Sequence, residues 1–124
     1  MSSDRKTIGV TAAAQAVLER LVALGSFRDQ LDAGRFALSI AVAAEETPSG
    51  TADVTTKWNI GSFDPSGEIR SVIQALYPGT SEPYRAAEQL IDAGLRILSK
   101  HLDLHAHLEL DVLLPNLSEA PEMA

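Results

Sequence analysis

The stretch Leu31–Ala44, LDAGRFALSIAVAA, decides how this chain of 124 residues folds. It contains no proline, and its apolar side chains recur at helical spacing on two sides. One stripe consists of Ala33, Phe36, Ala37, Ile40 and Ala41, and the other of Leu31, Leu38 and Val42. A helix that is apolar on two sides must be covered on both, either by its own chain or by a second copy.

We expect a second copy to cover part of this helix, because a chain this short has few other elements to offer. The protein is therefore predicted to form a homo-oligomer. The predicted interface consists of the larger apolar residues of the stretch: Leu31, Phe36, Leu38, Ile40 and Val42.

Length and composition restrict the class of protein. The chain has the length of one domain, and 45% hydrophobic residues suffice for a core. No apolar run approaches the roughly 18 residues of a membrane span, and the N-terminus lacks the apolar core of a signal peptide. With no cysteine, the chain forms neither disulfides nor thiolate metal sites. We expect a cytoplasmic protein with no membrane partner.

The charge balance bears on nucleic-acid binding. Ten basic and seventeen acidic side chains give a formal net charge of −7. Such a charge works against non-specific binding to phosphates, although a local basic strip remains compatible with it.

Residues 5–44 are predicted to form a strand followed by two helices. The segment RKTIGV alternates like a strand, and Thr11 can cap the helix AAAQAVLERLVAL, which Gly25 ends. Ser26 and Asp29 have the spacing of a capping box before a second helix over residues 27–44.

Residues 54–101 are predicted to repeat the order strand, helix, helix after a linker over residues 45–53. The strand covers residues 54–60, the loop GSFDPSG follows, and Asp64 can cap the third helix. A fourth helix extends to about Lys100. The predicted fold class is therefore mainly α with short strands (α+β), in a single domain.

The segment Leu102–Leu114 alternates between apolar and polar residues, so we predict a C-terminal strand, followed by a loose tail over residues 115–124. On a strand His105 and His107 project to one side, and His101 is the candidate third metal ligand. We favour a polar outer strand face over a metal site, and predict no metal and no cofactor.

Catalytic motifs are absent from the sequence. The loop GSFDPSG lacks the lysine of a phosphate-binding loop, and no G-x-S-x-G elbow or cysteine nucleophile occurs. We expect that the chain is not an enzyme.

Residues 5–44 resemble ribbon-helix-helix proteins, with RKTIGV as ribbon, TAAAQAVLERLVALG as first helix and SFRDQLDAGRFALSIAV as second. In that family two strands pair into an antiparallel ribbon whose outward side chains read the major groove. The resemblance implies DNA contacts by Arg5 and Thr7. If the second half supplies the partner strand, Thr55, Lys57 and Asn59 join them; the ribbon could form within one chain or between two.

A more particular likeness concerns the sequence LGSFRDQLDAGRFALSIAVAAEETP followed by a polar strand and the helix EIRSVIQALY. These segments resemble the DndE family, which accompanies DNA phosphorothioation enzymes. The resemblance implies a helical oligomer associated with DNA and with the sulfur-modification machinery.

Two functions remain open from sequence. The first is a small oligomeric DNA-associated accessory or regulatory protein of ribbon-helix-helix type. The second is a non-catalytic oligomeric adaptor that binds a larger protein partner and not DNA, which the net charge of −7 favours. A metal-dependent enzyme using His105 and His107 is the least favoured.

Overall fold

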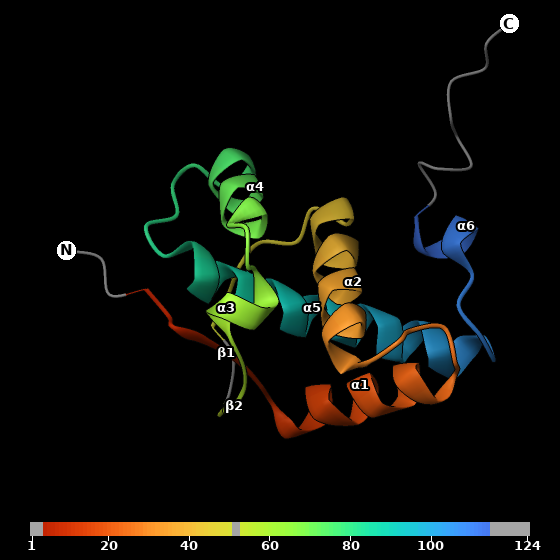
Figure 1. Ribbon diagram of the computed structural model, residues 1–124. Helices are drawn as coiled ribbons and strands as arrows, with labels where there is room; N and C mark the ends of the chain where they lie inside the picture. Colours follow the sequence, from red (N-terminus) through yellow and green to blue (C-terminus); the bar gives the residue numbers. More distant parts are fainter. Residues whose placement is uncertain (1–3, 51–52, 115–124) are drawn as a thin grey trace, which may run out of the picture.

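The computed structural model describes residues 4–50 and 53–114, which form six helical segments and a two-stranded sheet (Figure 1). The elements in chain order are β1 (Thr7–Val10), α1 (Ala12–Ala23), α2 (Gln30–Ala43), β2 (Thr55–Asn59), α3 (Ile60–Phe63), α4 (Glu68–Leu76), α5 (Pro83–Leu104) and α6 (Leu110–Leu113). The predicted class, mainly α with short strands, is confirmed. The predicted tail over residues 115–124 lies outside the described residues.

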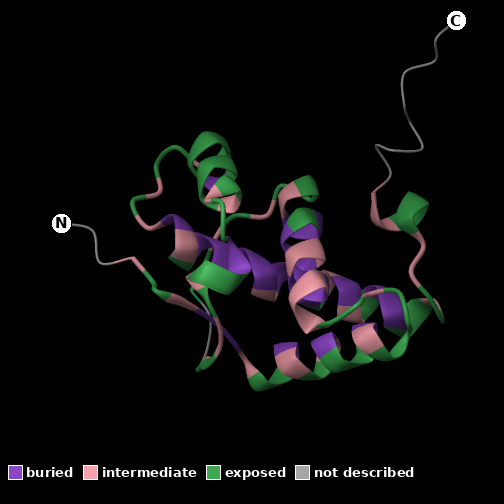
Figure 2. Ribbon diagram, in the orientation of Figure 1, coloured by how far each residue is buried: buried purple, intermediate pink, exposed green. Residues whose placement is uncertain are grey.

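Helix α5 is the longest element, and the other elements are arranged around it (Figure 1). Its apolar residues recur at helical spacing and are fully buried at Leu90, Ile91, Leu95 and Leu98. Figure 2 shows the buried residues concentrated on α5 and on the sides of α1 and α2 that face it. None of the described helices combines the length and the apolarity needed to cross a membrane.

The closest approach in the core is between α2 and α5. Figure 1 shows α2 crossing in front of α5, and the two helices make the most extensive contact in the fold. A Cβ atom on Gly94 would overlap the backbone carbonyl of Ala37. The helix backbones therefore touch here, which requires glycine on α5 and a small residue on α2.

This contact explains how one chain covers much of α2. Ile40 is 1% exposed and Leu38 is 7% exposed, both within the core of the single chain. The argument that a second copy must cover them therefore fails for these two residues. Leu31, Phe36 and Val42 are half-buried and retain surface on which another molecule could pack.

The sheet forms within one chain, since β1 pairs antiparallel with β2. Ile8 lies opposite Trp58, and an irregularity follows between Ile8 and Gly9. Ile8 is buried, and the Trp58 ring packs on Gly34 of α2, where a Cβ atom would come within 2.6 Å of it. One face of the sheet therefore covers the helices, and the alternate residues face outward.

The predicted helix starts are partly confirmed. Thr11 Oγ1 accepts a hydrogen bond from the Ala14 amide at 3.0 Å, as expected of the cap of α1. The second helix begins later than predicted, because Asp29 and not Ser26 is its cap: the Asp29 carboxylate accepts from the Asp32 amide at 2.9 Å. The turn α3 was predicted as loop; Asn59 starts it by accepting from the Ser62 amide.

The predicted strand over residues 102–114 is wrong. Helix α5 continues to Leu104, bends follow, and the short helix α6 occupies residues 110–113. Leucine and alanine favour helix over strand, and no neighbouring strand offers hydrogen bonds to this segment among the described residues. The alternating pattern therefore did not determine the structure.

We predict that Gly94→Ala destabilises the protein, because the methyl group cannot fit against the Ala37 backbone. Alanine alone would favour a helix by about 1 kcal/mol, so a net loss of about 2 kcal/mol or more indicates the overlap. Urea unfolding followed by circular dichroism measures this loss. Gly79→Ala is the matched control, since nothing lies within 4 Å of its added Cβ, and an equal loss there would contradict the prediction.

Candidate nucleic-acid interface

The sheet carries positive charge in an otherwise acidic protein. Residues 5–10 and 54–59 include three of the ten basic side chains, Arg5, Lys6 and Lys57, and none of the seventeen acidic ones. The rest of the chain is left with seven basic and seventeen acidic side chains. Lys57 lies in β2, and Arg5 and Lys6 directly precede β1, so the two strands and the residues that lead into them form a cationic strip.

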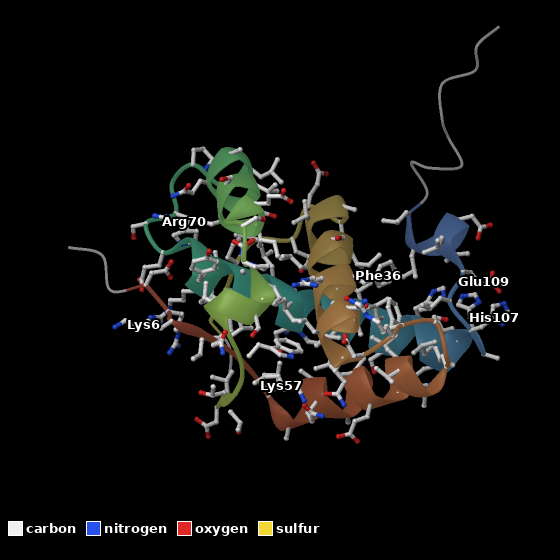
Figure 3. All side chains as sticks on the ribbon, viewed as in Figure 1. Lys6, Phe36, Lys57, Arg70, His107 and Glu109 are labelled. Atoms are coloured by element: carbon white, nitrogen blue, oxygen red, sulfur yellow. The ribbon has the colours of Figure 1, made fainter. Side chains whose placement is uncertain are left out.

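The outer face of the sheet is formed by residues that alternate with the buried ones. Thr7 pairs with Asn59, next to the inward-facing pair Ile8 and Trp58, so both lie on the outward side. Lys57 precedes Trp58, and its Nζ lies 6.0 Å from the centre of the Trp58 ring. Figure 3 labels Lys6 and Lys57 along the sheet, away from His107 and Glu109 at the other end of the molecule.

The structure places four of the five predicted DNA-contact residues in this sheet, Thr7, Thr55, Lys57 and Asn59, and the fifth, Arg5, two residues before β1. Two of them already have partners. Asn59 Oδ1 accepts from the Ser62 amide at 2.8 Å, which leaves the side-chain NH₂ group as a donor. An Arg5 terminal nitrogen lies 3.5 Å from Glu88 Oε2, while 42% of the Arg5 side chain remains exposed.

Glu88 anchors the sheet to α5, and the sequence interpretation missed it. Its side chain is 3% exposed, and Oε1 accepts a hydrogen bond from the Gly9 amide at 2.7 Å. A carboxylate this deeply buried needs such donors. The spacing in the sequence could have indicated this burial, because Glu88 lies four residues after Tyr84 and three before Ile91, on the apolar side of the helix.

A second buried carboxylate, Asp64, joins α4 to α5. It accepts hydrogen bonds from the amides of Ile69 and Arg70, both at 3.0 Å, and from the Tyr84 hydroxyl at 2.8 Å. Burial alone would raise the pKa of Asp64, but these hydrogen bonds outweigh it and hold the pKa below the ordinary value of 3.8. Burial and the bond to Asp64 raise the pKa of Tyr84 to about 12.

Asp64 was predicted to cap the third helix, and its role is related but different. Gly67, with φ 77°, occupies the cap position of α4. The Asp64 carboxylate reaches past it to the amides of the first helical turn, where a negative charge is stabilised.

The histidines do not form the metal cluster considered from sequence. His101 is buried, and its Nε2 accepts a hydrogen bond from the Glu109 amide at 3.0 Å. The His105 ring stacks on His101 with centroids 4.4 Å apart, and His107 Nε2 lies 3.4 Å from Glu109 Oε1. Across residues 4–50 and 53–114, no three histidine or acidic side chains are grouped so as to hold a metal ion.

Comparisons with protein-family models, curated proteins and solved structures gave no match for this chain.

We predict that Glu88→Ala lowers the free energy of unfolding by about 1–3 kcal/mol, because the buried Gly9 amide loses its acceptor. Arg5→Ala should cost less than about 1 kcal/mol, since this ion pair is long and partly exposed. Urea unfolding compares the two variants, and hydrogen exchange at the Gly9 amide reports the site directly. Equal losses in both variants would show that the ion pair, and not the amide bond, matters.

The Asp64 network predicts a pH dependence. Since folding lowers the pKa of Asp64, its stabilising contribution is present above pH 3.8 and is lost as the pH falls through the folded value. Asp64→Asn should therefore cost about 2 kcal/mol at pH 7 and progressively less below about pH 4. Urea unfolding of both proteins between pH 7 and pH 3 measures the difference, and a constant difference contradicts the assignment.

Proposed function

We propose that this chain is a small cytoplasmic, oligomeric accessory or regulatory protein of ribbon-helix-helix type that contacts DNA through the outer face of the β1–β2 sheet. The observation that carries the proposal is the cationic strip, with three basic and no acidic side chains in residues 5–10 and 54–59. The order strand, helix, helix in each half agrees with it, although the second half contains the additional turn α3.

The side chains of the strip divide by chemistry. Arg5, Lys6 and Lys57 suit phosphate contacts, which supply affinity without sequence preference. The free NH₂ group of Asn59 and the Thr7 hydroxyl suit hydrogen bonds to base edges. With three phosphate contacts per copy, log K should fall with log salt concentration with a slope of about −3 for each bound copy.

Oligomerisation is proposed around the exposed part of α2. Leu31 and Phe36 are half-buried, and the Phe36 ring lies 5.2 Å from that of Phe27. This aromatic surface is separate from the core residues Leu38 and Ile40, so it could pair with a second copy without unfolding the chain.

The alternative is an oligomeric adaptor that binds a protein partner and not DNA. It is favoured by the remainder of the sequence, in which seventeen acidic side chains outnumber seven basic ones. The adaptor would show no affinity for DNA even at low salt concentration, whereas the first proposal requires binding that weakens steeply as salt is added.

Charge reversal in the strip tests the proposal. Fluorescence anisotropy with a labelled duplex should show at least about tenfold weaker binding for the variant Lys6→Glu/Lys57→Glu, because two phosphate contacts become repulsive. Arg28→Glu/Lys100→Glu is the matched control: it makes the same change in net charge, both residues are exposed and lie outside the sheet, and binding should change much less. Light scattering should give the same oligomeric state for all three proteins.

Two results would contradict DNA contact by the sheet. One is the absence of binding by the wild-type protein at low salt concentration, which favours the adaptor. The other is equal weakening by the control variant, which would place the contact elsewhere or reduce it to net charge.

A further inference from the structure

A hollow of about 630 Å³ lies between α2 and α4, on a side of the molecule separate from the sheet's outer face. It exists because the packing around α5 is uneven: α1 packs against both α2 and α5, whereas α4 packs mainly against α5. Figure 1 shows α2 and α4 beside each other. Its volume falls in the range of ligand-binding clefts.

Hydrogen bonds tie the two walls together at both ends, so the hollow is held open. The Arg35 guanidinium of α2 donates to the carbonyl oxygens of Phe63 and Ser62, just before α4. At the other end the Tyr77 hydroxyl donates to the Glu46 carbonyl oxygen at 2.8 Å. Arg35 lies in the first half of α2 and is joined to α3, which precedes α4, whereas Glu46 follows α2 and is joined to Tyr77 at the end of α4. The two helices therefore run in the same direction and border an elongated groove.

The walls of this groove are mostly apolar. Leu38 and Val42 of α2 face Ile69, Val72 and Ile73 of α4 across it. Val72 is 50% exposed, and Leu76, one helical turn further along α4, is 52% exposed. Apolar surface therefore extends along α4 beyond the hollow itself. A linear occupant matches this shape better than a compact one.

The charges available at the groove are negative. Arg35 is engaged by two carbonyl oxygens, and its Nη1 lies 3.6 Å from Asp32. Arg70 of α4 points away from α2 (Figure 3). Glu68, at the start of α4, is exposed and lines the groove.

At the opposite end, exposed Glu45 directly follows α2: its amide donates to the carbonyl oxygen of Val42, a residue that lines the groove. Burial, followed by the charges of Glu46 and Glu45, raises the pKa of the Tyr77 hydroxyl. Within the described residues, no lysine, arginine or histidine nitrogen lies within 4 Å of Glu45, Glu46 or Glu68. The two ends of the groove therefore carry carboxylates that the chain leaves unneutralised.

We propose that the groove binds an amphipathic helix of a partner protein that carries basic residues at both ends of its apolar face. The groove follows α2 from Arg35 to Ala43, eight residues or about 12 Å, which corresponds to about two helical turns of the partner. Leucine-like side chains spaced at i, i+3, i+4 and i+7 would enter between Leu38, Val42 and Val72. Basic residues before and after them would meet Glu68 and Glu45.

This surface is independent of DNA contact by the sheet. Carboxylates at both ends of the groove repel phosphates, so nucleic acid is not its occupant. The protein could therefore hold DNA on the sheet and a basic helix in the groove at once, and failure of either proposal leaves the other intact.

Binding of a synthetic peptide tests the proposal. The probe is a fluorescein-labelled helical peptide of about fourteen residues, with leucines at i, i+3, i+4 and i+7 and two lysines at each end. The control peptide replaces the lysines by glutamates. We expect the full chain to bind the basic peptide at least about tenfold more tightly than the acidic one, with the difference shrinking at high salt concentration.

Variants locate the binding. Val72→Asp should weaken binding of the basic peptide at least about tenfold, because it places a charge on the apolar wall. Val112→Asp is the matched control, since Val112 is also 50% exposed but lies on α6. Glu45→Lys/Glu68→Lys should reverse the preference between the two peptides, whereas Glu19→Lys/Asp53→Lys, with the same change in net charge, should not.

Several results would overturn the proposal. Equal binding of both peptides, no binding of either, or equal effects of Val72→Asp and Val112→Asp each exclude a specific basic-helix groove. If Val72→Asp changes the oligomeric state in light scattering and leaves peptide binding unchanged, the groove is an interface between copies. Binding of a small apolar dye that the peptide does not displace would assign the groove to a small ligand.

Discussion

The backbone contact between Gly94 of α5 and Ala37 of α2 is the constraint on which the rest of the structure depends. Because the helices touch without intervening side chains, α2 can lie against α5 closely enough to bury its own apolar residues. The same placement puts Gly34 under the Trp58 ring, which positions β2 and so the sheet. The same placement forms one wall of the groove, because α2 is packed tightly against α5, whereas α4 packs mainly against α5 and leaves a hollow toward α2.

Two buried carboxylates fix the remaining elements to this core. Glu88 holds the backbone of β1 through the Gly9 amide, and Asp64 holds the first turn of α4 while accepting from Tyr84 of α5. Both oxygens of each carboxylate have a hydrogen-bond donor or a cation as partner. Among the described residues, no buried side-chain polar atom lacks a hydrogen-bond partner. Directional hydrogen bonds thus add to packing in setting the positions of the sheet and of α4.

Sequence patterns predicted the elements that depend on local chemistry. The cap of α1 was predicted at Thr11, whose short oxygen-bearing side chain reaches a nearby amide. The cap of α2 was expected at Ser26, but Asp29 takes this role with the same chemistry. Sequence patterns gave a wrong prediction where the local structure depends on contacts with residues further along the chain. Alternation over residues 102–114 suggested a strand, but the helix α5 simply continues to Leu104, and the His101 ring then binds the Glu109 amide.

The sequence predicted some residues of the candidate site and missed others. The outward strand residues followed from period-two alternation, and the structure gathers them on one sheet. The role of Glu88 depends on a hydrogen bond to a residue 79 positions earlier, which no local pattern reveals. The sequence also gave no indication of the groove between α2 and α4. The groove arises because α4 packs mainly against α5 and not against α2, and no sequence motif marks such an arrangement.

Formation of the sheet from two different segments of one chain has a consequence for molecular recognition. When two identical strands pair across a symmetry axis, both edges of the ribbon present the same side chains, and a matching partner must share that symmetry. Here Thr7 lies on one strand, with Arg5 just before it, whereas Lys57 and Asn59 lie on the other. A surface with two unlike edges has a direction, so a molecule lying along it would be held in one orientation and would need no inverted repeat of its own.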